Sequence, residues 1–307
     1  MRKIYLTTGL LMALLQVVSA QMPGDGLMMP KRQWCTVLQY THSSWDEYWE
    51  GENKRSNSNL GTFTSQNVML MSNYGITDRL NIMAALPYVW TGSDSYLQGE
   101  KGVQDISLRL KYQPFSTAFA GGEFKVQVSG GASIPSHNYP ADFLPFSIGL
   151  HSRTASLRGV LNYTHSLGFY FTAQAGHTWR GKVEIDRDSY LYDNVLYYTN
   201  EVPVPNMVDA TGRLGFINKR LQAEVTLDYF TGLTGDDIRY NEAPFLTNKM
   251  QATTAGVFAK VFLGHYAIQA SAGQVLSGRN VGQSTMFTGG FTYQFGLGGG
   301  AAQEDPQ

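Results

Sequence analysis

The sequence predicts an all-β protein, a transmembrane antiparallel up-and-down β-barrel of about twelve strands. Three observations support this fold: stretches of about ten residues alternate polar with apolar side chains, short turns alternate with long polar loops, and the strand count is even. Alternation at a period of two places the two kinds of side chain on opposite faces of an extended chain. The composition, with 18 Tyr, 16 Phe, 33 Gly and 11 Pro, suits aromatic-rich strands joined by turns.

The alternation is clearest in the stretch GVQDISLRLKY, residues 102–112. Asp105, Arg109 and Lys111 share one parity, whereas the other parity carries isoleucine, leucines and a tyrosine. In a soluble sandwich the apolar face would enter a core, but in an outer-membrane barrel it faces lipid and the charges line the interior. A charge on the lipid face costs about 2 to 4 kcal/mol at mid-depth, which gives this sorting a physical cause.

The first residues predict export. Arg2 and Lys3 precede an apolar run over residues 4–18, and the small residues Ser19 and Ala20 form a cleavage point, so residues 1–20 are interpreted as a signal peptide. A retained membrane anchor is less favoured because the run is short for a spanning helix. Without Arg2 and Lys3 the chain keeps 21 basic and 24 acidic residues, a net charge of -3. This balance argues against a nucleic-acid partner.

The mature chain is predicted to be one barrel with two tails. Residues 21–33 are interpreted as an N-terminal periplasmic segment, residues 34–295 as the barrel, and residues 296–307, which open with GLGGG, as a flexible C-terminal tail. Cys35 is the only cysteine, so no internal disulfide can form, and we expect a buried, inert thiol.

Twelve strands follow in order, and short turns separate the two strands of most hairpins. The expected strands are residues 34–42, 61–74, 80–90, 102–112, 123–134, 154–164, 169–179, 207–216, 221–230, 251–262, 266–276 and 286–295. A compact turn is expected over residues 114–122 because of Pro114 and the glycines that follow. Aromatic residues gather where strands end, which suits two interfacial girdles; they are Tyr74, Tyr112, Tyr163, Phe216, Phe262 and Phe295 beside the short turns, and Trp90, Trp179 and Tyr229 beside the long loops.

The charged residues on the inward parity are the candidate functional residues. As a set they would form the selectivity surface of a channel or transporter. The alternative is that they satisfy one another in a closed lumen, which would make the protein a plugged structural or adhesive barrel. The candidates are Asp105, Arg109, Lys111, Glu123, Lys125, Arg158, Asp209, Arg213, Glu224, Asp228 and Lys260.

Other candidate sites are weaker. The tyrosines of the loop 180–206 could line an entrance or simply cover a surface. The loop acids Asp186, Asp188, Asp193, Asp236 and Asp237 could bind a divalent cation, but no spaced calcium-loop motif appears, so solvated acids are favoured and neither a metal nor a cofactor is predicted.

His177 raises the question of an enzyme, because some outer-membrane barrels are lipid hydrolases with a serine and a histidine near the outer rim. The residues after His177 are Thr178, Trp179, Arg180 and Gly181, without the serine two positions on that the barrel phospholipases show. We therefore interpret His177 as a lone interfacial histidine and predict that the protein is not an enzyme.

The last expected strand resembles the terminal signal that the bacterial barrel-assembly machinery reads. The pattern is a polar residue, a glycine two positions on, and then two aromatics at alternate positions, here Thr288, Gly290, Tyr293 and Phe295. It departs from the common form because Phe295 is not the final residue. The resemblance implies the assembly machinery and outer-membrane lipid as partners.

Two stretches, YGITDRLNIMAALPYVW and GVQDISLRLKY, are similar to a family of outer-membrane transporters named for the meta-cleavage pathway of phenol degradation. In that family a strand ending in tyrosine turns through Gly-Thr-Asp-type residues into an apolar strand ending Leu-Pro-Tyr, followed by a Gly-x-x-Asp strand ending Lys-Tyr. The close match covers residues 74–112. The resemblance implies a barrel in the bacterial outer membrane and suggests passage of small, aromatic or apolar molecules, without fixing a substrate.

Overall fold

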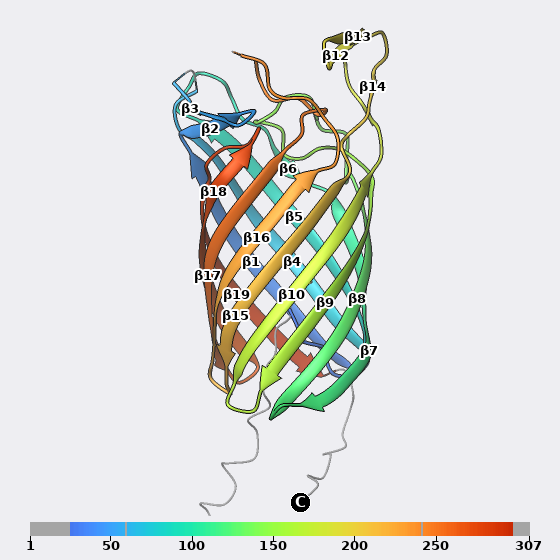
Figure 1. Cartoon of the computed structure of the whole chain (residues 1–307), viewed down its shortest axis with the longest axis vertical. Coiled ribbons are helices and arrows are strands. Elements are labelled where there is room, and N and C mark those ends of the chain that lie inside the picture. Colours follow the sequence, from blue (N-terminus) through green and yellow to red (C-terminus); the bar gives the residue numbers. More distant parts are fainter. Residues whose placement is uncertain (1–24, 59, 241, 297–307) are drawn as a thin grey trace, which may run out of the picture.

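Twelve long strands form a closed antiparallel barrel in the computed structural model, which describes residues 25–58, 60–240 and 242–296 (Figure 1). Each strand pairs with its neighbours in the chain, and the pairing of β1 with β19 closes the sheet. The barrel strands are β1 (Gln33–Trp45), β4 (Phe63–Thr77), β5 (Leu80–Ser93), β7 (Ile106–Phe119), β8 (Gly122–Ile134), β9 (Thr154–His165), β10 (Phe169–Arg180), β15 (Met207–Ile217), β16 (Leu221–Gly232), β17 (Gln251–Leu263), β18 (Tyr266–Arg279) and β19 (Thr285–Gly296). The predicted fold class is confirmed.

Seven short strands lie at the end of the barrel that carries the long connections (Figure 1). Six of them pair locally, as β2 does with β3, and elaborate the loops that the sequence predicted as irregular, whereas β6 pairs with the barrel strand β5. They are β2 (Glu47–Glu50), β3 (Asn53–Ser56), β6 (Lys101–Val103), β11 (Val183–Glu184), β12 (Tyr190–Tyr192), β13 (Val195–Tyr197) and β14 (Glu201–Val202). In outer-membrane barrels the long connections are extracellular and the short turns periplasmic, which orients the molecule. Among the described residues no helix is long and apolar enough to cross a membrane.

Two expected elements around β7 differ from the sequence prediction. The expected strand 102–112 is interrupted at residues 104–105, which belong to neither β6 nor β7. The expected compact turn at 114–122 is wrong, because β7 continues to Phe119 and the turn is only residues 120–121, both at positive φ as a two-residue hairpin turn requires. Pro114 falls where the register with β8 shifts, so its missing N–H interrupts no regular ladder.

Side chains alternate between lipid and lumen as the sequence predicts. Leu108 and Leu110 are 53% and 48% exposed, whereas Lys111 on the opposite face is 0% exposed. One assignment is wrong: Phe262, expected in an interfacial girdle, is 6% exposed and packs on Ala267 inside the barrel. It shares its parity with Lys260, so the rule that placed Lys260 inside applies to it as well.

Aromatic residues of β1, β4, β18 and β19 form one belt on the lipid face at the periplasmic end. The ring of Trp34 lies 5.6 Å from that of Tyr74 and 6.3 Å from that of Phe295. Tyr293 in turn stacks on Tyr266 at 5.0 Å. The belt spans the pairing of β1 with β19 and so covers the place where the barrel closes.

Replacing Tyr293 and Phe295 together with alanine should lower the yield of folded barrel several-fold without altering secretion. The change removes the proposed assembly pattern as well as ring contacts that contribute about 0.5–1.5 kcal/mol each. Folded yield is measured by the resistance of the barrel to unfolding on unheated gels. The control is the alanine pair at Leu276 and Phe287, which are 53% and 57% exposed on β18 and β19 outside the pattern. An equal loss in both pairs would show that only lipid-facing area matters.

Candidate functional site

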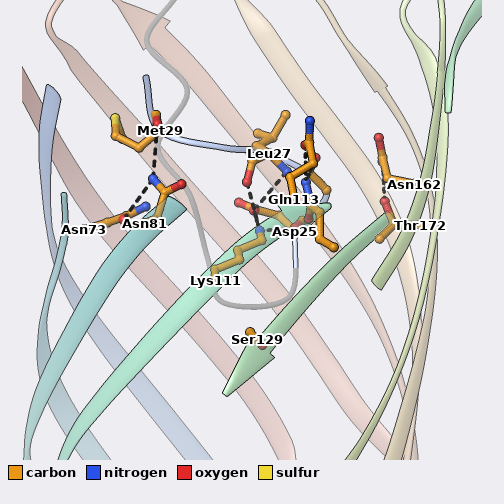
Figure 2. A network of polar contacts seen from close by, with 12 residues as sticks. Asp25, Leu27, Met29, Asn73, Asn81, Lys111, Gln113, Ser129, Asn162 and Thr172 are labelled. Atoms are coloured by element: carbon orange, nitrogen blue, oxygen red, sulfur yellow. Dashed lines mark hydrogen bonds and ion pairs between the residues drawn. The ribbon is translucent and has the colours of Figure 1, made fainter. Parts of the chain in front are cut away.

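The N-terminal segment, residues 25–32, enters the barrel at its periplasmic end, where residues 25–29 contact the inner wall and residues 30–32 are exposed (Figure 2). Met29 is 0% exposed and packs with Cys35, Val37 and Met71 on the inner wall. The N-terminal periplasmic segment predicted over residues 21–33 therefore enters the lumen in part, and its last residue, Gln33, belongs to β1. The predicted signal peptide and the C-terminal tail beyond Gly296 lie outside the described residues.

Lys111 holds this segment to the wall. Its ammonium group, 0% exposed, donates to the carbonyl oxygens of Asp25 at 2.5 Å and Leu27 at 2.9 Å. It also forms an ion pair with the Asp25 carboxylate at 3.2 Å. A buried ammonium is costly unless it is paired and hydrogen-bonded. The segment supplies every acceptor that the structure assigns to Lys111, as Figure 2 shows.

Two amides of the wall and one glycine complete the attachment. Gln127 donates to the Gly26 carbonyl at 2.9 Å, and Asn81 donates to the Met29 carbonyl at 3.2 Å. Gly75 allows the backbone of the segment to approach the wall closely, since a Cβ at this position would lie 2.0 Å from the Pro30 carbonyl oxygen. The segment thus offers mainly its backbone carbonyls to the wall.

Other inward charges form ion pairs between strands that are adjacent, as β15 and β16 are, or separated by one strand, as β9 and β15 are. Arg158 binds Asp209 at 2.6 Å, and Arg213 binds Glu224 at 2.9 Å. The Tyr170 hydroxyl donates to the second oxygen of Glu224 at 2.6 Å. These contacts give the inner wall a fixed arrangement of alternating charge.

The remaining predicted lumen residues occupy different depths. Lys125 pairs with Glu123 at 2.9 Å near the turn after β7. The Asp228 carboxylate accepts a hydrogen bond from Thr211 at 2.6 Å, and Lys260, 1% exposed, lies 5.4 Å from the Phe262 ring centre. Asp105 sits in the break between β6 and β7. The structure therefore spreads the eleven candidates along the lumen, and their role in selectivity stays a prediction.

Cavities lie on both sides of the charged pairs. One of about 700 Å³, on the periplasmic side, is lined by Leu27, Lys125 and Tyr170 among others. Another, of about 640 Å³ and nearer the extracellular end, is lined by Arg158, Asp228 and Met250 among others. Arg213 borders both cavities. The lumen is therefore not filled completely by its own side chains.

Sequence reasoning missed an apolar part of the inner wall. A cavity of about 300 Å³ is bordered by β1, β4, β5 and β7 and has Met69, Met71 and Met83 in its lining. These methionines share the inward parity of their strands, which was the signal available in the sequence. Outer-membrane barrels usually line the interior with polar residues, so an apolar inner patch stands out.

The extracellular loops pack into a small core of their own. Val183, Tyr190, Val202 and Leu246 are buried together there, while Tyr198 is 84% exposed. The predicted tyrosine-lined entrance is neither supported nor excluded by this packing, and it stays a prediction.

Two of the candidate loop acids are engaged by protein groups. Arg279 binds Asp237 through two hydrogen bonds of 2.8 and 2.7 Å, and these bonds lower the pKa of the Asp237 carboxyl. Asp236 accepts hydrogen bonds from Thr247 and Asn248. Within residues 25–58, 60–240 and 242–296, no group of three or more potential ligands is placed to hold a metal ion.

His177 lies on the lipid side of β10, with its ring 4.4 Å from that of Trp179. Its Nδ1 is buried and has no hydrogen-bond partner in the described part of the chain. A catalytic base needs a hydrogen-bonded nucleophile within reach. This geometry favours the interpretation of His177 as an interfacial histidine.

Comparisons with known proteins found a matching family model and solved structures of outer-membrane barrels. Residues 50–289 match the family model described as "Putative MetA-pathway of phenol degradation". A crystal structure of an outer membrane channel from Pseudomonas putida F1 is similar, with a TM-score of 0.70, 17% identity, and coverage of 90% of this chain and 100% of that one. The NanC porin gives a TM-score of 0.47 at 8% identity, covering 83% of this chain and 98% of the porin. No curated protein matches the chain in sequence.

Proposed function

The chain belongs to the family described as "Putative MetA-pathway of phenol degradation", and from that premise we propose that it is an outer-membrane channel for small molecules with an apolar or aromatic body. The observation that carries this proposal is the unfilled lumen, with cavities of about 700 and 640 Å³. Both volumes are in the range of small-molecule sites. The methionine-lined patch supplies an apolar surface beside them.

The competing function is a plugged barrel with a structural or adhesive role. It is favoured by residues 25–32, which occupy the lumen at the periplasmic end. Two features argue for a movable closure instead. The segment has a single ion pair to the wall among its described residues, Asp25 with Lys111, and its other polar contacts use mainly backbone carbonyls. Because these bonds are few, they hold the short segment more weakly than side-chain packing would hold a folded plug domain.

Recording ion current through the purified protein in a planar bilayer tests the proposal. We expect discrete channel openings, and phenol added at millimolar concentration should reduce the ion current because it occupies the lumen. Glycerol, which is similar in size but lacks an apolar ring, is the control solute and should have a smaller effect. A folded barrel that never conducts, with or without residues 25–32, would favour the plugged barrel.

A further inference from the structure

The methionine-lined cavity has one arginine in its lining. Its inner surface combines Cys35, Val37, Met69, Met71 and Met83 with the guanidinium-bearing Arg109. Methionine side chains are flexible and polarizable, so they adapt to apolar ligands of different shape. At about 300 Å³ the cavity lies at the lower end of the range for small-molecule sites. It can therefore accept a small apolar body with one polar end.

Arg109 differs from the neighbouring lumen arginines in lacking a carboxylate partner. Among the described residues it forms no ion pair, and its one hydrogen bond, to the Ser129 hydroxyl, is long at 3.4 Å. Arg158 and Arg213, in contrast, are bound by Asp209 and Glu224 at 2.6 and 2.9 Å. Arg109 is only partly exposed, so water screens its charge incompletely.

The surroundings of Arg109 increase its affinity for an anion. Arg158 is close enough for its positive charge to act on Arg109, and Asp209, which also acts on Arg109, is already bonded to Arg158. The guanidinium lies directly over Gly131 of β8, since a Cβ there would lie 3.3 Å from Arg109 Cζ. Planar guanidinium groups bind carboxylates through two parallel hydrogen bonds. A carboxylate is therefore the group that this end of the cavity lacks.

We propose that the cavity binds a small carboxylate with an apolar body, its carboxylate on Arg109 and its body among Met69, Met71 and Met83. The inference rests on the proposed channel function, because the ligand reaches the cavity through the lumen. The site adjoins the N-terminal segment, since Met29 packs against Cys35 and Val37. Lys111, which anchors that segment, lies one inward residue further along β7 toward the periplasmic end.

Calorimetric titration of the folded, detergent-solubilised protein with benzoate at pH 7 tests the site. Benzamide, which has the same ring but no charge, is the matched ligand. We expect measurable binding of benzoate, binding of benzamide at least tenfold weaker, and at least a tenfold loss of benzoate affinity in Arg109→Met. Lys219→Met is the control: it removes one exposed charge in the turn between β15 and β16 and should leave benzoate affinity unchanged.

A second variant, Met69→Trp, fills the cavity without changing charge and should also weaken benzoate binding. It keeps the test decisive if Arg109→Met fails to fold. Benzoate binding that is unchanged in folded Arg109→Met or Met69→Trp would overturn the site. Ion current is recorded from the same preparation: a conducting wild-type protein that does not bind benzoate overturns the carboxylate site alone, whereas a folded, non-conducting protein overturns the proposed channel.

Discussion

Replacing Lys111 with methionine should increase the open-channel current of the purified barrel several-fold, because the N-terminal segment loses its anchor. Lys111 supplies three contacts to residues 25–27, two to backbone carbonyls and one to the Asp25 carboxylate. Hydrogen bonds to charged groups contribute about 1.5–3 kcal/mol each, and every 1.4 kcal/mol changes an equilibrium tenfold. Losing them should shift the segment from closed to open by a factor of about a hundred or more.

The matched control for this change is Lys125→Met. It removes the same charge from the same lumen, but Lys125 pairs with the exposed Glu123 and forms no hydrogen bond or ion pair with the described residues of the segment. Asp25→Asn should have a smaller effect than Lys111→Met, because both backbone carbonyl contacts are kept. The measurement is single-channel conductance together with protease sensitivity of residues 25–32. A folded Lys111→Met barrel with wild-type conductance would mean that the segment does not limit the current.

The barrel could be predicted from sequence because lipid imposes a strict rule on every second residue. Leu108 and Leu110 face lipid and Arg109 and Lys111 face the lumen, as their parity indicates. A charge facing the hydrocarbon is costly, so the pattern repeats in each strand. The same rule, applied to Phe262, would have placed it inside with Lys260. Its expected place in a girdle was wrong because nearness to a turn was given more weight than parity.

The N-terminal segment could not be predicted in the same way. Residues 25–32 contact the wall mainly through backbone carbonyls, and any sequence presents those. The segment also lacks the alternation that marks a strand, so it was interpreted as a tail. Lys111 is fully buried on the inner wall, but parity does not reveal which partner an inward charge has. Such partners depend on a segment distant in sequence, 86 residues away in the case of Asp25.

The sequence contains the signal for the apolar inner patch. Met69, Met71 and Met83 lie on the parity that carries polar residues elsewhere, so they break the rule that defines the fold. Local departures from such a rule are expected at functional sites. The distinction between Arg109 and the paired arginines, however, requires the register of the strands, because each ion pair joins residues of different strands.

Replacing Arg213 with methionine should destabilise the folded barrel by about 3–5 kcal/mol, the usual cost of breaking a buried ion pair from one side. The Arg213 and Glu224 side chains are 16% and 3% exposed, so little water is available to Glu224 once its partner is removed. Tyr170 donates one hydrogen bond to Glu224, which compensates for only part of the lost contact. Glu224 would then be a buried carboxylate without a cationic partner.

The double variant Arg213→Met with Glu224→Gln tests whether the unpaired charge of Glu224 causes the loss of stability. A neutral amide in place of the carboxylate removes the uncompensated charge, so the double variant should regain more than half of the lost stability. Urea unfolding of the barrel in lipid vesicles, followed on unheated gels, measures each free energy. If each single change cost less than about 1 kcal/mol, the pair would behave as a solvated surface ion pair. In that case the cavities of about 700 and 640 Å³ on either side would connect through water at Arg213.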